Sequence, residues 1–500
     1  MYTPYTGMYT MYTRSMRNHY PIEESQMFVL LAALLSGAMF YLSQGLADIW
    51  ALAWFAPVPL LWLAYGRAPT WQVAGASAVA ILAGSAYALQ CYATLPVMII
   101  VAVVAPQVVL FPMAVVFARM VQRRGPALLT LIAFPATWTA IEYLVGVISP
   151  HGTYGSLAYS QVSAPLLIQG ASLFGYCAVT FMLCLFANTL AMASRAKRNS
   201  IPAIVTGLAI CAVNVAFGLE RLSPPSPSPQ TVRVAAMVDE TAAGYAWHAK
   251  TLQDASAVVE TYAQAIRGAA AQGAAFVVTP EGGMPLKTAW EPAIRAQLAE
   301  VANQANVHIV AGFNEMEPAG DIALSFQPGT AVQLYAKRHP VPILEDRFVP
   351  GTQSGWLGNG RAMEICKDMD FPSTIRADAA RGVRLMGVPA GDFGLDAWMH
   401  ARMAVMRSVE GGFAMVRAAN EGLVTINDAQ GRLIASKVAA PAGLTQVVAD
   451  VPLGSGSTIY IRIGDVFAWF CVAISLLAGV SLGRHGFPFR QDSRSGHRSP

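Results

Sequence analysis

The sequence predicts a multi-span α-helical membrane protein with an inserted α/β domain. Of its 500 residues, 55% are hydrophobic and 12% are charged, which is about half the charged fraction of an ordinary soluble domain. The apolar excess is concentrated in residues 27–220 and near 463–483. Residues 231–455 have the mixed composition of a soluble domain. A membrane part and a folded insert are therefore both expected.

Several apolar segments are long enough to be interpreted as membrane spans. They lie near residues 27–44, 47–65, 72–90, 95–118, 126–148, 165–193, 201–219 and 463–483. Arg and Lys cluster in alternate connections between these segments, and such connections face the cytoplasm. We therefore expect both termini in the cytoplasm and the insert on the opposite side. The first segment lacks a small-residue cleavage site, so it is expected to remain as a signal-anchor.

Composition divides the chain into consecutive parts. The predicted order is a low-complexity cytoplasmic N-terminus (1–26), a seven-span transmembrane domain (27–220), a Pro/Ser linker (221–230), an α/β domain (231–455), a C-terminal transmembrane helix (456–485) and a basic cytoplasmic tail (486–500). Within the α/β domain, short apolar strands alternate with helical patterns, as in layered α/β folds. Strands are expected at 231–238, 274–281, 308–313, 331–338, 361–366, 384–390, 413–420 and 422–428, and helices at 248–272, 291–305 and 395–410.

The sequence carries no signal for a metal, a cofactor or nucleic acid. Its His and Cys residues do not have zinc-ligand spacing, and no glycine-rich loop is suited to phosphate. No basic stripe interleaved with aromatic residues suggests nucleic acid. The net charge of +4 is explained by the basic connections between spans.

Three ionisable side chains of different kinds lie at the ends of predicted strands. Glu281 closes "FVVTPE", Lys337 closes "QLYAK" and Cys366 closes "MEIC", whereas the other five cysteines lie in apolar segments. The carboxyl ends of strands are where α/β sheets build sites. A carboxylate can take a proton from a thiol, and an ammonium can favour the thiolate and stabilise an oxyanion. Together the three residue types predict acyl transfer through a thioester.

Each of these residues also fits a structural role when taken alone. Cys366 could be a small core residue at a strand end. Glu281 could be a carboxylate favoured by a helix N-terminus, and Lys337 could belong to a solvated strand edge. The sequence around them decides between these interpretations.

Several stretches resemble known families. "TPEGGMP", "YAKRHPVPILEDRFVP" and "EICKDMDFP" resemble the three catalytic-motif regions of the nitrilase, or carbon–nitrogen hydrolase, superfamily. "LADIWALAWFAPVPLLWLAYG" (46–66), "GTYGSLAYSQVSAPLLIQGASLFGYCAVTF" (152–181) and "HARMAVMRSVEGGFAMVRAANEG" (400–422) are similar to the membrane-fused branch of that superfamily, the bacterial apolipoprotein N-acyltransferases. The resemblance runs along most of the chain and implies a nitrilase-like α-β-β-α sandwich.

The resemblance also implies residue roles and substrates. The implied roles are general base for Glu281, oxyanion-stabilising lysine for Lys337, nucleophile for Cys366, support of the site for Glu345 and Asp368, and substrate contact for Trp247. The acyl donor would be a membrane phospholipid and the acceptor the N-terminal diacylglyceryl-cysteine of a lipoprotein. The protein would lie in the bacterial inner membrane with its catalytic domain in the periplasm.

Some substrate-facing positions depart from the usual family pattern. Lys367 stands where an aromatic residue usually follows the nucleophile, Asp392 replaces the Trp of a Trp-Phe-Gly turn, and Glu421 replaces the second Asn of Asn-Asn-Gly. Asp368 falls where Glu is usual. Two alternatives stay open: a membrane-tethered amidase of the nitrilase type, and a non-enzymatic membrane scaffold. Retention of all three reactive residue types argues against the scaffold.

Overall fold

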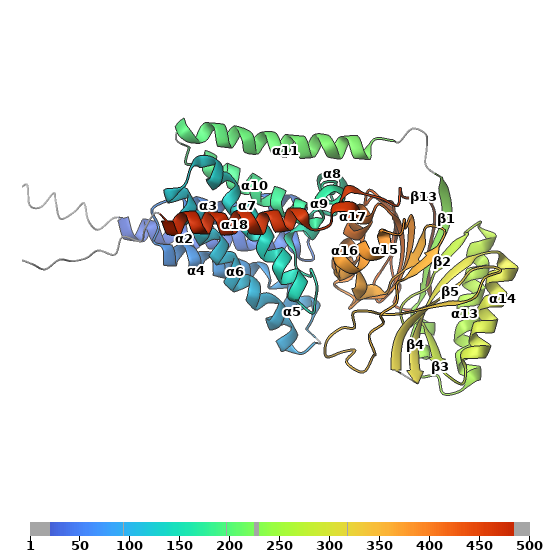
Figure 1. Cartoon of the computed structure of the whole chain (residues 1–500). Coiled ribbons are helices and arrows are strands. Elements are labelled where there is room, and N and C mark those ends of the chain that lie inside the picture. The colour runs from blue at the N-terminus through green and yellow to red at the C-terminus, as the bar shows by residue number, and fades with distance from the viewer. Residues whose placement is uncertain (1–20, 94, 197, 225–229, 318, 485–500) are drawn as a thin grey trace, which may run out of the picture.

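The molecule has two ends of different architecture (Figure 1). The computed structural model describes residues 21–484 except 94, 197, 225–229 and 318. A helical bundle forms one end, and a two-sheet α/β domain forms the other. This confirms the predicted fold class. The predicted N-terminal tract up to residue 20, linker residues 225–229 and the basic tail lie outside the described residues.

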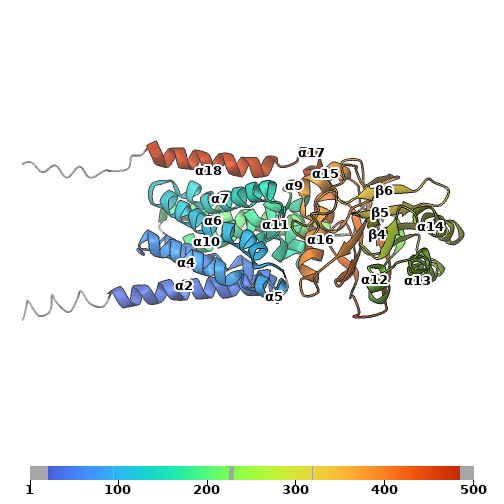
Figure 2. The ribbon, with the colours of Figure 1, turned by 90° about the horizontal axis from the view of Figure 1, so that it is seen from below.

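Among the described residues, seven helical stretches are long and apolar enough to cross a membrane. They are Gln26–Gln44 in α2 (Pro21–Gln44), Thr70–Cys91 with α4 (Thr70–Gly84) and α5 (Tyr87–Cys91), α6 (Val97–Arg124), α7 (Ala127–Ile148), α10 (Tyr176–Ala193), Arg198–Leu222 with η3 (Arg198–Ser200) and α11 (Ile201–Leu222), and Val466–Gly483 in α18 (Val466–Arg484). In Figures 1 and 2, the first turn of α2 and the last turn of α18 lie at the bundle end away from the α/β domain. These two ends therefore lie on the same side of the bundle.

The predicted span at 47–65 is wrong as one membrane helix. A 3₁₀-helix, η1 (Trp50–Trp54), and a short helix, α3 (Val58–Ala64), stand in its place. Pro57 lies between them, and proline has no amide hydrogen to continue a helix. The apolar stretch Trp50–Ala64 is shorter than the other spans. The predicted seven-span domain thus holds six helices of spanning length among its described residues.

The start of the predicted span at 165–193 is also broken. It folds as α8 (Pro165–Ile168) and α9 (Ala171–Phe174) before α10 begins. Gly175 between α9 and α10 has φ +70°, a conformation that glycine adopts without steric cost. A preceding loop contains the 3₁₀-helix η2 (Leu157–Gln161).

The α/β domain consists of two mixed sheets. One has the order β13-β1-β2-β4-β5-β6, with β3 paired to β4, and the other has the order β12-β11-β10-β9-β8-β7. The strands are β1 (Thr231–Asp239), β2 (Phe276–Val278), β3 (Met284–Lys287), β4 (His308–Glu317), β5 (Ala319–Phe326), β6 (Gln333–Ala336), β7 (Trp356–Gly358), β8 (Arg361–Met363), β9 (Leu385–Gly391), β10 (Ala414–Asn420), β11 (Leu423–Asn427), β12 (Leu433–Val438) and β13 (Leu444–Pro452).

Helices cover the outer face of each sheet, which gives the α-β-β-α order. The helices of the domain are α12 (Glu240–Ala246), α13 (Leu252–Ala271), α14 (Glu291–Ala305), the 3₁₀-helix η4 (Cys366–Asp370), α15 (Pro372–Ala379), α16 (Ala397–Gly411) and α17 (Ile459–Ile463). Apolar residues of α13 and α14 form one core with β1, β2, β4 and β5. A second core between the sheets includes Val234, Phe276, Leu385 and Val416. The apolar face of α16 joins a core shared with the membrane helices.

Polar contacts fix the α16 side of the domain to the bundle. Asp48 accepts a hydrogen bond from Trp398 Nε1 at 2.8 Å and lies 3.3 Å from Arg402 Nη1. The Thr153 hydroxyl donates to the carbonyl of Asp370 at 2.8 Å. Since Asp370 ends η4, the membrane part directly supports the segment that carries Cys366.

Candidate active site

The two sheets bring Glu281, Lys337 and Cys366 together. Glu281 follows β2, Lys337 follows β6, and Cys366 begins η4. Lys337 Nζ donates a hydrogen bond to Glu281 Oε1 at 2.6 Å. The Cys366 thiol donates to the carbonyl of Gly391 at 3.3 Å, and the Glu281 charge acts on it. Strand ends that are far apart in the sequence thus form one cluster.

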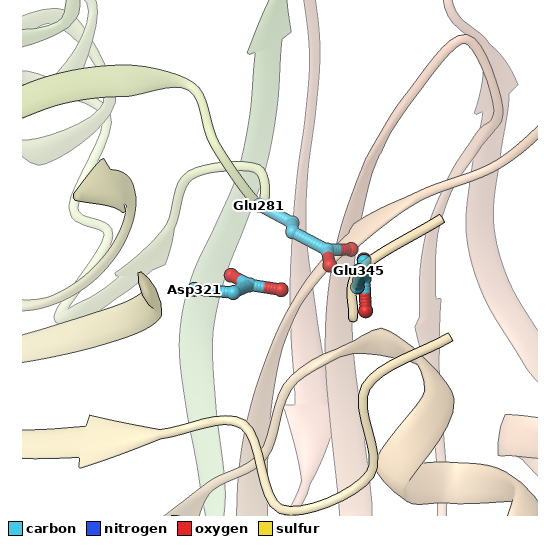
Figure 3. A group of neighbouring side chains, drawn as sticks. All are labelled: Glu281, Asp321 and Glu345. Atoms are coloured by element: carbon cyan, nitrogen blue, oxygen red, sulfur yellow. The ribbon is translucent and has the colours of Figure 1, made fainter. Parts of the chain in front are cut away.

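Lys337 lies among three carboxyl groups. Its Nζ is 2.8 Å from Glu345 Oε1 and 3.1 Å from Asp321 Oδ2, in addition to the contact with Glu281. Figure 3 shows the three carboxyl groups converging from different segments. One carboxyl oxygen from each of the three lies within 4.8 Å of the others. Here the ammonium of Lys337, whose side chain is only 2% exposed, supplies a positive charge to all three.

The ionisation of this pair follows from opposing effects. Burial disfavours a charged Glu281, but the Lys337 ammonium and hydrogen bonds hold the pKa of Glu281 below its usual value. Burial equally disfavours a charged Lys337, but the carboxylates around it, Glu281 first, raise its pKa well above the usual range. Glu281 is therefore an ionised proton acceptor beside a fixed cation.

The backbone of Cys366 has a positive φ, and the surroundings of its side chain favour the thiol over the thiolate. Its φ is +40°, which is uncommon for a residue with a Cβ and is often found at functional sites. Burial and then the Glu281 charge raise the pKa of the thiol well above its usual value, and Lys337 and Arg417 offset this only in part. Lys337 favours the thiolate, in the direction expected from the sequence, but burial outweighs it and the resting site holds a thiol. The proton must leave during the reaction.

Glu345 belongs to this cluster, whereas Asp368 lies beside it. Glu345 contacts Lys337, and its other oxygen accepts from the backbone of Val341 at 2.6 Å. Asp368 accepts backbone hydrogen bonds from Arg338 and His339 at 3.1 and 2.9 Å. Burial raises the pKa of Asp368 to about 6. Asp368 therefore anchors the segment after Lys337 rather than contacting its ammonium.

Sequence reasoning missed two groups of the site. Asp321 lies on β5, a strand that was not expected, and its carbonyl accepts from the backbone of Lys337 at 3.0 Å. The Asn420 side chain donates to the carbonyl of Glu281 at 2.7 Å. A possible signal for Asp321 was a single acidic residue at the start of the apolar run "DIALSF".

A cavity of about 380 Å³ connects the cluster with the membrane helices. Glu281, Lys337 and Cys366 line it. Side chains of the membrane part also line it, among them Ala88, Tyr92, Leu95, Ile99, Ile100 and Val103. Trp247 also lines the cavity and is 51% exposed. The reactive groups are therefore continuous with apolar residues of α5, α6 and their connection.

Comparisons with known proteins divide the chain in the same way. A family model described as the apolipoprotein N-acyltransferase N-terminal domain matches residues 36–189, and a carbon-nitrogen hydrolase model matches residues 241–463. A relative named apolipoprotein N-acyltransferase from Geobacter metallireducens is 29% identical, over 89% of this chain and 93% of its own. The chain belongs to the apolipoprotein N-acyltransferase family.

Further matches have lower identity or cover less of the chain. The relative of the same name from Chromobacterium violaceum is 26% identical over 71% of this chain and 73% of its own. A solved amidase structure from Nesterenkonia sp. is 23% identical, with a TM-score of 0.39, over 48% of this chain and 95% of its own.

Three of the four positions that depart from the usual pattern of apolipoprotein N-acyltransferases, Lys367, Asp392 and Glu421, line the same cavity. Lys367 is 7% exposed, and its Nζ lies 3.6 Å from the Asp370 carboxylate. Asp392 makes a buried two-point contact with Arg417, at 2.5 and 3.1 Å. The backbone of Glu421 donates to Glu240 at 2.6 Å. Each of these three residues contacts a charged residue of its own. The cavity wall therefore differs from the usual family pattern, while Glu281, Lys337 and Cys366 stay together.

Proposed function

We propose that this enzyme transfers an acyl chain from a membrane phospholipid to an amine through a thioester on Cys366. The observation that carries the proposal is the cavity that joins Cys366 to apolar residues of the membrane helices. A phospholipid has a polar ester between its headgroup and its acyl chains. In this cavity the ester carbonyl can reach the thiol while an acyl chain lies against α6.

In the first half-reaction, the Cys366 sulfur attacks the ester carbonyl carbon and Glu281 takes the thiol proton. Lys337 stabilises the negative charge that develops on the carbonyl oxygen. The carbon–oxygen ester bond then breaks, and Glu281 returns the proton to the departing alcohol. The products are a lysophospholipid and an acyl thioester on Cys366.

In the second half-reaction, an amine attacks the thioester carbonyl and gives its proton to Glu281. Lys337 again stabilises the oxyanion, the carbon–sulfur bond breaks, and the thiolate recovers the proton. The product is an amide. The apolar walls of the cavity limit access of water, which favours aminolysis of the thioester over hydrolysis.

We further propose that the acceptor is the N-terminal diacylglyceryl-cysteine of a lipoprotein. The similarity to relatives named apolipoprotein N-acyltransferase supports this acceptor. It is itself a lipid-modified group, so it can reach the cavity from the membrane surface, as the donor does. We place the α/β domain on the periplasmic side of the bacterial inner membrane, in accord with the basic connections.

A mass-spectrometric assay tests the proposal. Purified protein is incubated with phospholipid and a synthetic peptide that begins with diacylglyceryl-cysteine. N-acylated peptide with an equal amount of lysophospholipid is the expected result, and omission of the peptide should leave an acyl adduct on Cys366. Free fatty acid without acylated peptide would favour a hydrolase. Loss of neither substrate and no adduct on Cys366 would exclude both enzymatic functions.

A further inference from the structure

The cluster around Lys337 has more carboxyl groups than one cation can balance. Lys337 donates hydrogen bonds to Glu281 and Glu345, at 2.6 and 2.8 Å. Asp321 is a third carboxyl group, 3.1 Å from the same Nζ. If all three were ionised, three negative charges would face one positive charge in a largely buried site. Like charges at this spacing disfavour simultaneous ionisation.

Of the three carboxyl groups, that of Asp321 accepts the fewest hydrogen bonds. Among the described residues, no donor with hydrogen-bond geometry reaches either of its carboxyl oxygens. The residue is 7% exposed. Burying an ionised carboxylate without hydrogen bonds is costly, whereas a protonated one can donate to a neighbouring carboxylate. A Glu281 carboxyl oxygen lies within 4.8 Å of an Asp321 carboxyl oxygen, so Glu281 is the neighbouring carboxylate to which a protonated Asp321 would donate.

We propose that Asp321 carries a proton in the resting enzyme and shares it with Glu281, so that Lys337 balances only Glu281 and Glu345. The titratable groups that face Asp321 are Glu281 after β2, Lys337 and Glu345 after β6, and Cys366 on η4. Burial and the Glu281 charge raise the pKa of Asp321 well above its usual range, in accord with the geometry.

Asp321 is thus a positioning residue that acts through Glu281. A neutral Asp321 leaves the Lys337 ammonium to Glu281 and keeps that carboxylate ionised and oriented. An ionised Asp321 would compete for Lys337 and would make a thiolate on Cys366 harder to form. This consequence for catalysis rests on the proposed function, but the protonation state itself can be measured without turnover.

The first test is the pH dependence of stability in the full chain with Asp321→Asn. A proton held by the native state and lost by the unfolded chain makes the parent less stable as pH rises above the ordinary aspartate pKa of about 4. The asparagine variant has no such proton. We therefore expect the Tm of the variant minus that of the parent to increase steadily from about pH 5 to about pH 8, across the range over which only the unfolded carboxyl is ionised.

Asp254→Asn is the matched control. Asp254 is exposed, and backbone and side-chain hydrogen bonds hold its pKa below the usual value. Its replacement should lower the Tm once the carboxylate is ionised, the opposite sign to Asp321. For Asp321→Asn, a Tm difference that stays constant with pH, or that becomes more negative as pH rises, would overturn the proposal.

The second test is infrared spectroscopy of protein labelled with ¹³C at the aspartate carboxyl groups. At about pH 8, well above the pKa of about 6 of Asp368, the parent should show the C=O band of a protonated carboxylic acid, and Asp321→Asn should lack it. If the substitution removed only carboxylate absorption, Asp321 would be ionised and the proposal wrong. Because neither test uses a substrate, an absence of acyl transfer would overturn the proposed function and leave this inference standing.

Discussion

At Cys366, proton acceptance by Glu281 matters more for activation than the nearby positive charge. The surroundings raise the pKa of the thiol well above its usual value, with burial as the largest cause. In the proposed mechanism, Cys366 is therefore a thiol until substrate arrives. Glu281 is ionised, its side chain is 12% exposed, and its charge acts on that thiol. Activation then depends on proton transfer within the cluster.

Glu281→Gln should slow thioester formation by about 10²- to 10⁴-fold, the usual contribution of a general base. The amide keeps the shape of the side chain but cannot take the proton. The measurement is the rate at which an acyl adduct builds up on Cys366 with phospholipid alone. Glu300→Gln, at an exposed position of α14, is the control and should match the parent. An unchanged rate in Glu281→Gln would assign the base to another group.

The alkylation rate of Cys366 should keep rising at alkaline pH. A thiol of ordinary pKa reaches half its maximal rate near pH ~8.5, whereas the raised pKa of Cys366 delays the thiolate to higher pH. Removing the Glu281 charge removes one cause of the increase, so Glu281→Gln should shift the profile toward lower pH. The profile is obtained by mass spectrometry after timed exposure to a small neutral alkylating reagent. A half-maximal rate at or below pH ~8.5 in the parent would contradict this prediction.

How far the site could be predicted depended on the strand that carries each residue. Glu281 and Lys337 stand just beyond the ends of apolar strands, so both could be selected from the sequence. Asp321 lies at the start of β5, which runs antiparallel to β4 and β6. Its position at the same edge of the sheet follows from that pairing, which a single sequence does not reveal.

At the scale of elements, local periodicity predicted the helices well. The helix expected at 291–305 is α14 (Glu291–Ala305), and the one expected at 395–410 is α16 (Ala397–Gly411). β5 was missed because it is buried on both faces and shows no alternation. β13 was missed because its partner is β1, at the opposite end of the domain sequence. Whether such segments form strands depends on pairing with segments far away in the sequence.

Gly351→Ala tests how β6 holds Lys337. The Gly351 amide donates to the carbonyl of Lys337 at 2.8 Å, and an added Cβ would lie 2.1 Å from the carbonyl oxygen of Ala336. The end of β6 must move to make room. We expect a loss of about 1–3 kcal/mol of stability, together with a lower rate of thioester formation because Lys337 moves away from Glu281.

Gly268→Ala in α13 is the matched control for this substitution. No atom lies within 4 Å of a Cβ built at Gly268, and alanine is the better helix former by roughly 0.5–1 kcal/mol. Thermal unfolding and the rate of adduct formation on Cys366 are measured for both variants. If Gly351→Ala kept the parent values, the close approach to Ala336 would not be needed to place Lys337.

At the scale of the whole molecule, hydropathy located the membrane part but not every helix in it. The stretch at 47–65 is as apolar as a span, yet Pro57 divides it. The bundle and the sandwich also share a core through α16, and their cavity is lined by both parts. Which faces of the two parts meet depends on side-chain packing between segments far apart in the sequence. Composition alone does not contain that information.

Cysteine labelling in cells should find the α/β domain and the opposite bundle end on different sides of the membrane. In a Cys366→Ala background, Thr261→Cys reports the exposed face of α13, and Thr70→Cys reports the exposed start of α4. The basic connections are expected to stay in the cytoplasm. A membrane-impermeant maleimide should therefore modify Thr261→Cys in cells with an intact inner membrane, and Thr70→Cys only after permeabilisation. Labelling of Thr70→Cys alone in intact cells would put the domain in the cytoplasm, out of reach of lipoproteins in the periplasm.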